Sequence, residues 1–588
     1  MAKKSKKTIE YTPEQQAVID YMATPHDSKQ ICVINAFAGS GKTSVIEGAV
    51  KELRKNNPFA SILYLVFNAE RAEEARKKLK THGVDTRTVH SYALEKFKKQ
   101  KGGIFVANCI KPIEDLINSF RNDEIDKLKK GIKSEDERFF SLESNHPILK
   151  IWEDYEKSPI LNLDDYCRSI SDQGILSIVA GYNATQNTIN VFKYLYTVAV
   201  RRKVYTHGMY LKHYALEYND INHYDYVLID EAQDLNLHMA TILERLDYNN
   251  LYLVGDIYQQ IYEFMGTVNI MEKYLNRCTH TFTLGTSFRL NHITAEVCNE
   301  ILSFINNRIH ITAGHTAVTL PPSYSCITLF RYRASMTCFA IEQLLNNGNL
   351  IVKFVGQDYS TFDKVMSKET LSLLCALLDD DGQSQIADEI RTEFKVSKFL
   401  RSTIKSLVKQ ARNHRLTLNQ YMKAYYSSID INFAKVGTFY RKVVGILGFK
   451  AIPEGLRRLK HSMSKKKTED SDFLLLGTVH SSKGQQWDKV ILGPDNWDFD
   501  KLEELYIVYV ACSRAIYELD YTNLKTTLLC YKRYYRDLGW RPSKYGTIDQ
   551  LLNKDNVPDT EWVSAREQQY LDDIDDINVL EDLELSVV

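Results

Sequence analysis

The stretch ICVINAFAGSGKTS, residues 31–44, decides the fold of this chain. Its first residues are mostly apolar, as in a buried strand, and AFAGSGKT is followed by the helix-like sequence VIEGAVKEL. Glycines allow backbone N–H groups to approach phosphates closely, and the start of a helix adds positive potential. The order of strand, loop and helix therefore predicts a phosphate-binding loop, although Ala36 stands in place of the usual first glycine.

The residue types in this loop predict binding of ATP with Mg²⁺. We expect the Lys42 amino group to reach the β- and γ-phosphates and the Thr43 hydroxyl to bind Mg²⁺. ATP and Mg²⁺ are therefore the expected cofactors. The nucleotide-binding residues predicted in this segment are Ala38, Gly39, Ser40, Gly41, Lys42, Thr43 and Ser44.

The second half of the predicted site is YDYVLIDEAQD, residues 224–234. Two acids, Asp230 and Glu231, follow an apolar strand at the end where ligands bind in open parallel sheets. We expect Asp230 to hold Mg²⁺ and Glu231 to polarise the attacking water. A metabolic kinase or a GTPase would be more compact than this chain, so the wide spacing of the two halves predicts a large insertion and a second motor domain.

Further motifs follow in a fixed order along the chain. They are YTPEQQAVI (11–19), LYLVFNAERAEEA (63–75), TVHSYA (88–93), THGMYLKHYAL (206–216), GDIYQQIYEF (255–264), LGTSFRLN (284–291), TVHSSKGQQWDKVIL (478–492) and EELYIVYVACSRA (503–515). In this order the chain resembles superfamily 1 helicases of the UvrD/Rep/PcrA type, and most of all the F-box DNA helicase branch. One departure is Gln486, where that family usually has glutamate.

The resemblance implies roles for individual residues around the nucleotide. Gln15 would read adenine, Gln259 would sense the γ-phosphate, and Phe288 would stack on adenine. Arg289 and Arg514 would reach the γ-phosphate from the second domain, and such an arginine can raise the rate by a factor of roughly 10³–10⁵. The catalytic set implied by the resemblance and the two ATP motifs is Lys42, Glu231, Gln259, Arg289 and Arg514.

The resemblance also implies a nucleic-acid surface. Tyr262 and Phe264 would stack on bases of a single strand, each base contributing about 1–3 kcal/mol; both can also be core aromatics under a sheet. The nucleic-acid contacts implied by the motifs are Phe67, Asn68, His90, Tyr262, Phe264, His480 and Lys483.

These patterns predict an α/β fold of two RecA-like parallel-sheet motor domains, each with a mainly helical insertion. The predicted first motor domain comprises residues 1–92 and 206–280, with residues 93–205 as its insertion. The predicted second motor domain comprises residues 281–370 and 471–545, with a basic insertion over 371–470 and an acidic tail over 546–588.

Charge is distributed unevenly, although the formal net charge of the chain is zero. Residues 391–470 contain 19 lysines and arginines against 5 acids, whereas the last 18 residues hold seven acids and no base. The basic block is a candidate surface for a phosphate backbone, or a set of solvated helix faces. The acidic tail could recruit a protein partner or keep the chain soluble.

Composition predicts an intracellular protein without a membrane partner. No run of 18 apolar residues occurs, and the basic start MAKKSKKTIE has no apolar stretch behind it, so it is not a secretory signal. The ten cysteines form no CxxC pair, which fits a reducing compartment. We expect the cytoplasm or nucleoid, or the nucleus if the source is eukaryotic.

The predicted function is an ATP-dependent DNA helicase that moves along single-stranded DNA and acts at single-strand/duplex junctions in repair, recombination or replication. The resemblance implies 3′→5′ movement. One alternative is a single-strand translocase that strips recombinase or other proteins from DNA. Another is a helicase-like subunit of a larger nucleic-acid effector.

Overall fold

The computed structural model describes most of the 588-residue chain. The described residues are 10–66, 69–79, 82–101, 112–113, 115–116, 147–172, 175–176, 185–218, 222–262, 267–306, 308–315, 319–356, 359–396, 431–465, 472–497, 499 and 501–538. The predicted acidic tail and much of the basic block therefore lie outside the described residues.

The first sheet is parallel throughout and has the strand order β3-β2-β4-β5-β1-β6. Strands β1 and β2 are largely apolar because helices cover both faces of the sheet; every residue of β2 is buried. Its strands are β1 (Gln30–Ala36), β2 (Ile62–Val66), β3 (Asp85–Thr88), β4 (His223–Asp230), β5 (Asp247–Gly255) and β6 (His280–Leu284). The accompanying helices are α1 (Pro13–Ala23), α2 (Lys42–Asn56), α3 (Ala69–Leu79), α12 (Leu237–Arg245) and α13 (Ile270–Leu275).

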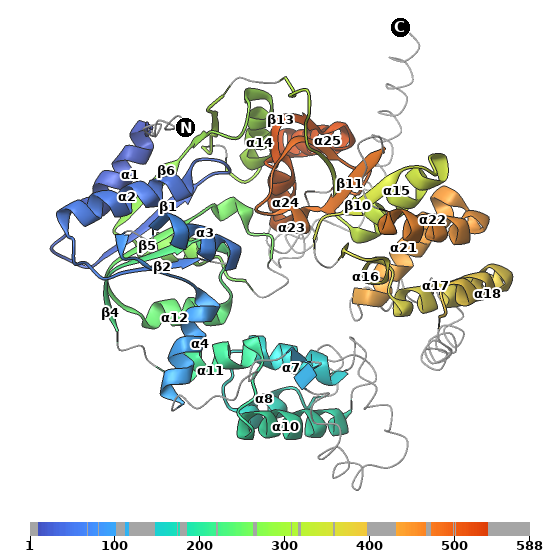
Figure 1. The fold of residues 1–588 in the computed structure, drawn as a ribbon, viewed down its shortest axis with the longest axis horizontal. Coiled ribbons are helices and arrows are strands. Elements are labelled where there is room, and N and C mark those ends of the chain that lie inside the picture. The colour runs from blue at the N-terminus through green and yellow to red at the C-terminus, as the bar shows by residue number, and fades with distance from the viewer. Residues whose placement is uncertain are drawn as a thin grey trace, which may run out of the picture.

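The described elements of the first insertion are helices, shown in teal below the first sheet in Figure 1. Aromatic side chains form their core, with Trp152, Tyr155 and Phe192 packed ring against ring around Tyr196. Helices α7 (Pro147–Lys157), α8 (Leu163–Ser169) and α10 (Gln186–Arg201) lie within the predicted insertion, and α4 (Val89–Gln100) and α11 (His207–Glu217) lie at its two ends.

The second sheet is also parallel and has the order β10-β11-β9-β12-β13. Its strands are β9 (Cys326–Phe330), β10 (Ile351–Phe354), β11 (Phe473–Thr478), β12 (Trp487–Leu492) and β13 (Ala515–Asp520). The helices around it are α14 (His292–Ser303), α15 (Arg333–Asn346), α23 (Val479–Ser482), α24 (Leu502–Cys512) and α25 (Thr522–Leu538). A short ladder of β7 (Thr286–Ser287) and β8 (Thr312–Ala313) lies in the chain between the two sheets.

A second helical insertion separates β10 from β11 in the chain and packs on α15, at the right of Figure 1. Its helices are α16 (Phe362–Val365), α17 (Lys368–Asp380), α18 (Ser384–Glu393), α21 (Ile431–Leu447) and α22 (Ile452–Ser464).

The predicted fold class is confirmed: two parallel α/β sheets, each interrupted by helices. One boundary differs, because β6 pairs with β1 in the first sheet and so the predicted division at residue 280 cuts through that sheet. The division falls after Leu284. Sequence alone did not show this, because HTFTL is largely polar and reads poorly as a sheet strand.

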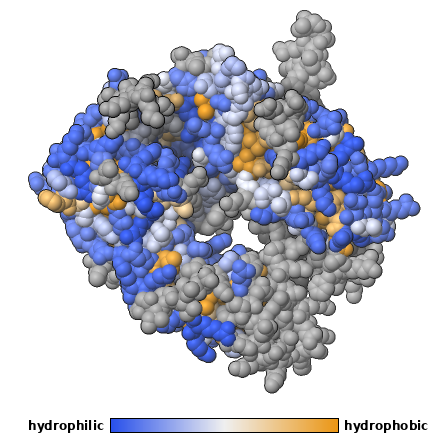
Figure 2. Space-filling view, in the orientation of Figure 1, coloured by the Kyte–Doolittle hydropathy of each residue, from blue (hydrophilic) through white to orange (hydrophobic). Residues whose placement is uncertain are grey.

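The surface is mostly hydrophilic on the face shown in Figure 2, with hydrophobic side chains in small patches. Within the described ranges, no helix combines the length and apolar character needed to cross a bilayer.

Candidate nucleotide and nucleic-acid site

The phosphate-binding loop connects β1 to α2 and takes the shape that its glycines allow. Gly39 and Gly41 have φ values of 76° and 82°, in the left-handed region. A Cβ atom at Gly39 would lie 2.5 Å from the Cβ of Arg289, and one at Gly41 would lie 2.8 Å from Nε2 of Gln15. Because Gly41 caps α2 without a side-chain hydrogen bond, the first N–H groups of this helix remain available to a ligand.

Two buried polar atoms beside the loop fit a bound phosphate. The Ser40 hydroxyl and Nε of Arg289 have no hydrogen-bond partner among the described residues. A buried polar atom without a partner is unfavourable, and phosphate oxygens would supply the missing acceptors. The predicted nucleotide-binding residues Ser40 and Arg289 are thus brought to the same loop, although they belong to motifs far apart in the sequence.

The predicted Mg²⁺ ligands come from the two strands next to β5. Thr43 is the second residue of α2, which follows β1, and Asp230 ends β4. The Asp230 carboxylate is buried and accepts hydrogen bonds from the Tyr64 hydroxyl (3.1 Å) and from the Glu231 backbone (3.0 Å). The described residues contain no group of three His, Cys, Asp or Glu side chains that could hold a metal. A hydroxyl and one carboxylate suit Mg²⁺ that is otherwise bound by substrate phosphates and water.

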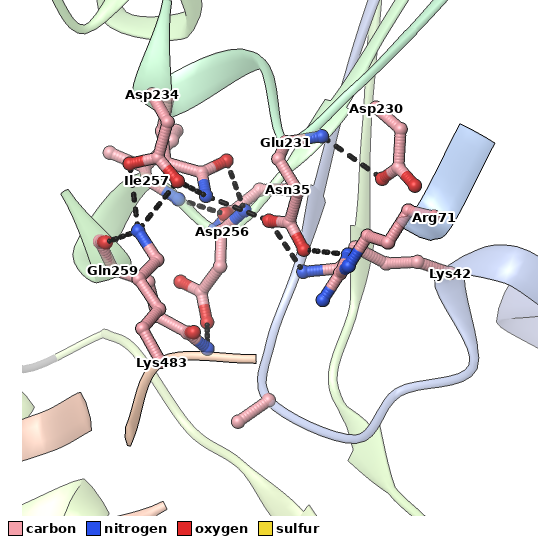
Figure 3. A network of polar contacts seen from close by, with 12 residues as sticks. Asn35, Lys42, Arg71, Asp230, Glu231, Asp234, Asp256, Ile257, Gln259 and Lys483 are labelled. Atoms are coloured by element: carbon pink, nitrogen blue, oxygen red, sulfur yellow. Dashed lines mark hydrogen bonds and ion pairs between the residues drawn. The ribbon is translucent and has the colours of Figure 1, made fainter. Parts of the chain in front are cut away.

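Glu231 lies at the centre of the charged network in Figure 3. Its φ of 53° is unusual for a residue with a side chain and turns the carboxylate towards the loop. The carboxylate accepts from Lys42 (3.5 Å), from Nη1 of Arg71 and from Nε2 of Gln233 (2.8 Å). Burial opposes its ionisation, but the cations Lys42 and Arg71 hold the pKa of Glu231 well below its usual range.

A hydrogen-bonded chain crosses from the first sheet to the second domain. Asp256, fully buried, accepts from Nε2 of Gln259 (2.7 Å) and from the Tyr509 hydroxyl (2.9 Å). The same hydroxyl accepts from the Ala38 backbone (3.2 Å), and Oε1 of Gln259 accepts from Arg514 (3.2 Å). The phosphate loop, the predicted γ-phosphate sensor and the second domain are therefore directly connected.

The two predicted arginine fingers lie together at this interface. Arg514 is only 2% exposed, and its guanidinium also donates to the Val510 carbonyl (2.9 Å) and the Ser513 hydroxyl (2.8 Å). Burial, together with neighbouring Arg289, lowers the pKa of Arg514 to about 9. Arg289 donates to the Ser513 carbonyl at 3.2 Å. Two cations held this close in a buried site favour an anionic ligand.

The predicted adenine-binding residues border the same loop. Phe288 is 48% exposed, and its backbone N–H donates to the Gly39 carbonyl at 2.9 Å. Gln15 is buried, and its amide donates to the Ser40 carbonyl (2.9 Å) and accepts from the Thr12 backbone (3.0 Å). Phe288 thus presents an open ring beside the loop, whereas the adenine contact of Gln15 stays a prediction because both ends of its amide are engaged.

The predicted nucleic-acid contacts are only partly brought together. Phe67, Asn68 and Phe264 lie outside the described residues. His90 hydrogen-bonds the Tyr210 hydroxyl (3.1 Å), and burial together with His207 lowers its pKa to about 4, so it is neutral at physiological pH.

Tyr262, His480 and Lys483 meet where the two motor domains touch. The Tyr262 hydroxyl donates to the His480 carbonyl (3.2 Å), and Nζ of Lys483 lies 4.8 Å from the centre of the Tyr262 ring. Lys483 forms an ion pair with Asp234 at 2.6 Å, and both side chains are less than a tenth exposed. Their contact with nucleic acid stays a prediction, and the observed role of Lys483 is a buried bridge between the domains.

Comparison with known proteins agrees with this geometry. The sequence model of the UvrD/REP helicase N-terminal domain family matches residues 13–278, which contain β1 to β5 of the first sheet but not β6. The first motor domain of this chain is therefore similar to that of the UvrD/REP helicases. F-box DNA helicase protein 1 of Schizosaccharomyces pombe is 23% identical, with 86% of this chain and 56% of the relative covered. F-box DNA helicase 1 of Gallus gallus is 26% identical, with 83% of this chain and 45% of the relative covered. The chain therefore spans about half the length of these relatives.

Sequence reasoning missed several residues that build this site. Arg71 lies in the segment predicted to face DNA, and nothing in NAERAEEAR separates it from the other charged residues of α3. Tyr509 was visible in the last motif, but its role depends on the contacts of its hydroxyl with Ala38 and Asp256 across the domain interface. Gln486, the departure from the family pattern, is exposed.

Proposed function

We propose that this UvrD-like chain is an ATP-dependent DNA helicase that moves 3′→5′ along single-stranded DNA and opens duplexes at junctions. The observation that carries the proposal is the shared site. Lys42, Glu231 and Gln259 come from the first domain, and Arg289 and Arg514 come from the second. Hydrolysis at a site of this kind depends on how the two domains fit together, which is what a stepping motor requires.

The residues support a specific division of labour during hydrolysis. The water oxygen bonds to the γ-phosphorus while the bond to the β–γ bridging oxygen breaks, and ADP leaves with that electron pair. Glu231 accepts a hydrogen bond and then the proton from the water. Lys42, Arg289 and Arg514 stabilise the negative charge that spreads over the phosphate oxygens. Bound Mg²⁺, held by Thr43 and Asp230, would supply further charge neutralisation.

Motion on DNA would follow from the contacts between Gln259 and both domains. Gln259 bonds Asp256 beside the phosphate loop and Arg514 of the second domain. Its chain neighbours lead within three residues to Tyr262, which touches His480 of the second domain. A change in Gln259 on loss of the γ-phosphate would therefore reach the predicted strand-binding surface over a short path.

Strand displacement tests the proposal most completely. Duplexes with a 3′ or a 5′ single-stranded tail would be mixed with the full chain, Mg²⁺ and ATP, with Lys42→Ala and Glu231→Gln as inactive controls. We expect unwinding from the 3′ tail only, and none in either variant. Unwinding only from the 5′ tail would contradict the polarity. DNA-stimulated hydrolysis without displacement would favour the alternative of a translocase that strips proteins from single strands.

Location and partners complete the proposal. We expect the chain to act in the compartment that holds its DNA substrate, the cytoplasm or nucleoid, or a nucleus. A protein partner of the acidic tail, residues 546–588, stays a prediction because the tail lies outside the described residues.

A further inference from the structure

Tyr509 reaches from the second domain to the phosphate loop of the first. It lies on α24, and its side chain is completely buried. Its hydroxyl accepts a hydrogen bond from the Ala38 backbone (3.2 Å) and donates one to the Asp256 carboxylate (2.9 Å). The hydroxyl therefore acts both as donor and as acceptor, and both of its partners belong to the first domain.

A buried tyrosine of the first insertion shows a different arrangement. The Tyr166 hydroxyl also bonds a backbone group and an aspartate, the Ile151 carbonyl (3.2 Å) and the Asp154 carboxylate (2.7 Å). Those partners lie in the same insertion, so these bonds hold one unit of the fold together. The partners of Tyr509 lie within its reach only while the two motor domains fit together, so its bonds depend on domain closure.

Asp256 connects Tyr509 to the groups that are predicted to react. The carboxylate oxygen that accepts from Tyr509 also accepts from Nε2 of Gln259 at 2.7 Å (Figure 3). The Asp256 backbone donates to Oε1 of Gln233 (3.2 Å), and Nε2 of Gln233 donates to Glu231 (2.8 Å). The predicted γ-phosphate sensor and the predicted base are thus both linked to the residue that Tyr509 holds.

Aromatic rings surround this connection. Phe37 of the phosphate loop stacks on Tyr258 with ring centres 6.0 Å apart, and Tyr258 meets Tyr506 of α24 edge to face at 6.1 Å. Phe37, Ala38 and Asp256 are all buried. Because solvent does not reach these atoms, loss of the hydroxyl would leave the Ala38 N–H without its partner and would remove one donor from Asp256.

We propose that Tyr509 is a positioning residue that brings the phosphate loop and Gln259 into their reactive arrangement when the second domain closes. It acts through Ala38 and Asp256 and contacts neither the phosphates nor the attacking water. Both arginine fingers arrive with the same closure, so the loop, the sensor and the arginines become ready together. The inference rests on ATP hydrolysis in the cleft, which is one part of the proposed function, and not on movement along DNA.

The test compares Tyr509→Phe with Tyr166→Phe in the full chain. Each change removes one buried hydroxyl that bonds a backbone group and an aspartate, but only Tyr509 lies at the cleft. The measurement is kcat and KM for ATP, with and without a saturating single strand of DNA. We expect kcat of Tyr509→Phe to fall about tenfold or more, the effect of one lost hydrogen bond to a carboxylate. KM should change less than about threefold, because the bonds belong to the closed, reacting state. Tyr166→Phe should match the wild type in both constants.

A second comparison separates positioning from a general loss of structure. Tyr509→Phe would also be introduced into Gln259→Ala. Because Tyr509 and Gln259 donate to the same oxygen of Asp256, part of the effect of Tyr509 passes through Gln259. The added loss of kcat should then be about threefold or less. Effects that multiply fully would overturn the inference, because Tyr509 would not act through Asp256.

Other outcomes overturn the inference in distinguishable ways. Wild-type kcat in Tyr509→Phe would show that the hydroxyl has no role, and an equal loss in Tyr166→Phe would show a structural role only. A raised KM with unchanged kcat would assign the hydroxyl to nucleotide binding alone. A wild type that hydrolyses ATP but opens no duplex would overturn the helicase proposal and not this one, whereas a wild type without hydrolysis would overturn both. Circular dichroism of each variant checks that it is folded.

Discussion

Two clusters of charged side chains in this molecule are similarly buried, but their side chains are arranged differently. One is the nucleotide cleft, and the other is the junction of α7, α11 and α12 at the base of the first insertion. In the junction, Glu156 accepts from Trp152 (2.9 Å) and Thr206, and Lys212 donates to the Tyr155 carbonyl and the Ser158 hydroxyl (3.0 Å). In the cleft, the ion pairs and hydrogen bonds join α2, α3, the end of β4 and the second domain.

The comparison teaches which observations mark a ligand site. Unpartnered atoms occur in both places, since Nδ1 of His238 at the junction has no partner among the described residues. Only the cleft combines such atoms with left-handed glycines, a strained Glu231 and cations from two domains. Buried charge alone is therefore a poor guide to function, and cations from two domains that converge beside unpartnered buried atoms are a better one.

The largest expected effect comes from removing charge in the cleft. Lys42→Ala and Glu231→Gln should each lower DNA-stimulated ATP turnover by about 10²-fold or more, because one binds phosphate and the other activates water. Both variants should remain folded, because each change removes one group of the Glu231 ion pairs and leaves the hydrophobic core around the first sheet intact. Lys77→Ala is the control, as that lysine forms only an exposed pair with Glu73 on α3. Turnover at the wild-type rate in either variant would place the chemistry elsewhere.

A smaller effect is expected for the bridge between the domains. Lys483→Met leaves Asp234 buried without its cationic partner; burial already raises the pKa of Asp234 to about 6 despite the lysine. We expect domain closure to weaken and DNA-stimulated kcat of Lys483→Met to fall by about tenfold. The double variant Lys483→Met/Asp234→Asn should recover part of this loss, because it no longer buries an unpaired carboxylate. Interaction energies between such coupled residues are about 0.5–3 kcal/mol. Steady-state kinetics of the two variants measures this. Equal losses in both would show that Lys483 acts on DNA and not through Asp234.

The smallest expected effect on turnover comes from the junction. Burial raises the pKa of Glu156 from its usual 4.5 to about 7, so the folded state binds a proton that the unfolded state releases. Stability should therefore fall as pH rises from 4.5 to 7 and stay lower above pH 7. Glu156→Gln keeps an acceptor for Trp152 and Thr206 and removes this loss. It should raise the melting temperature at pH 8 but not at pH 4.5, with ATP turnover unchanged.

Thermal unfolding across this pH range, followed by circular dichroism, checks the result. The exposed Glu153 on the same helix gives the matched control, and Glu153→Gln should keep the pH dependence of the wild type because Glu156 is unchanged. A Glu156→Gln variant that is equally destabilised at both pH values would mean that the carboxylate itself holds the junction together.

The residues of the cleft that the sequence predicted are those that lie within one short sequence motif. GSGKT and DEAQD each place a phosphate or metal group at the end of a strand, whatever the rest of the chain does. Glu231 and Arg71 are 160 positions apart in the sequence, and Asp234 and Lys483 are 249 positions apart. No sequence pattern around either residue of a pair predicts which residue it contacts. The same limit explains β6, whose polar sequence becomes a strand only because β1 offers it an edge.

The most direct test of the central claim is ATP turnover by Arg289→Ala on saturating single-stranded DNA, with nucleotide binding measured on the same sample. Arg289 reaches the phosphate loop from the second domain, and its removal leaves the loop itself intact. If the two domains share one active site, kcat should fall by roughly 10³-fold or more while nucleotide affinity changes far less. Unchanged turnover would contradict the account, because hydrolysis would then need only the first domain.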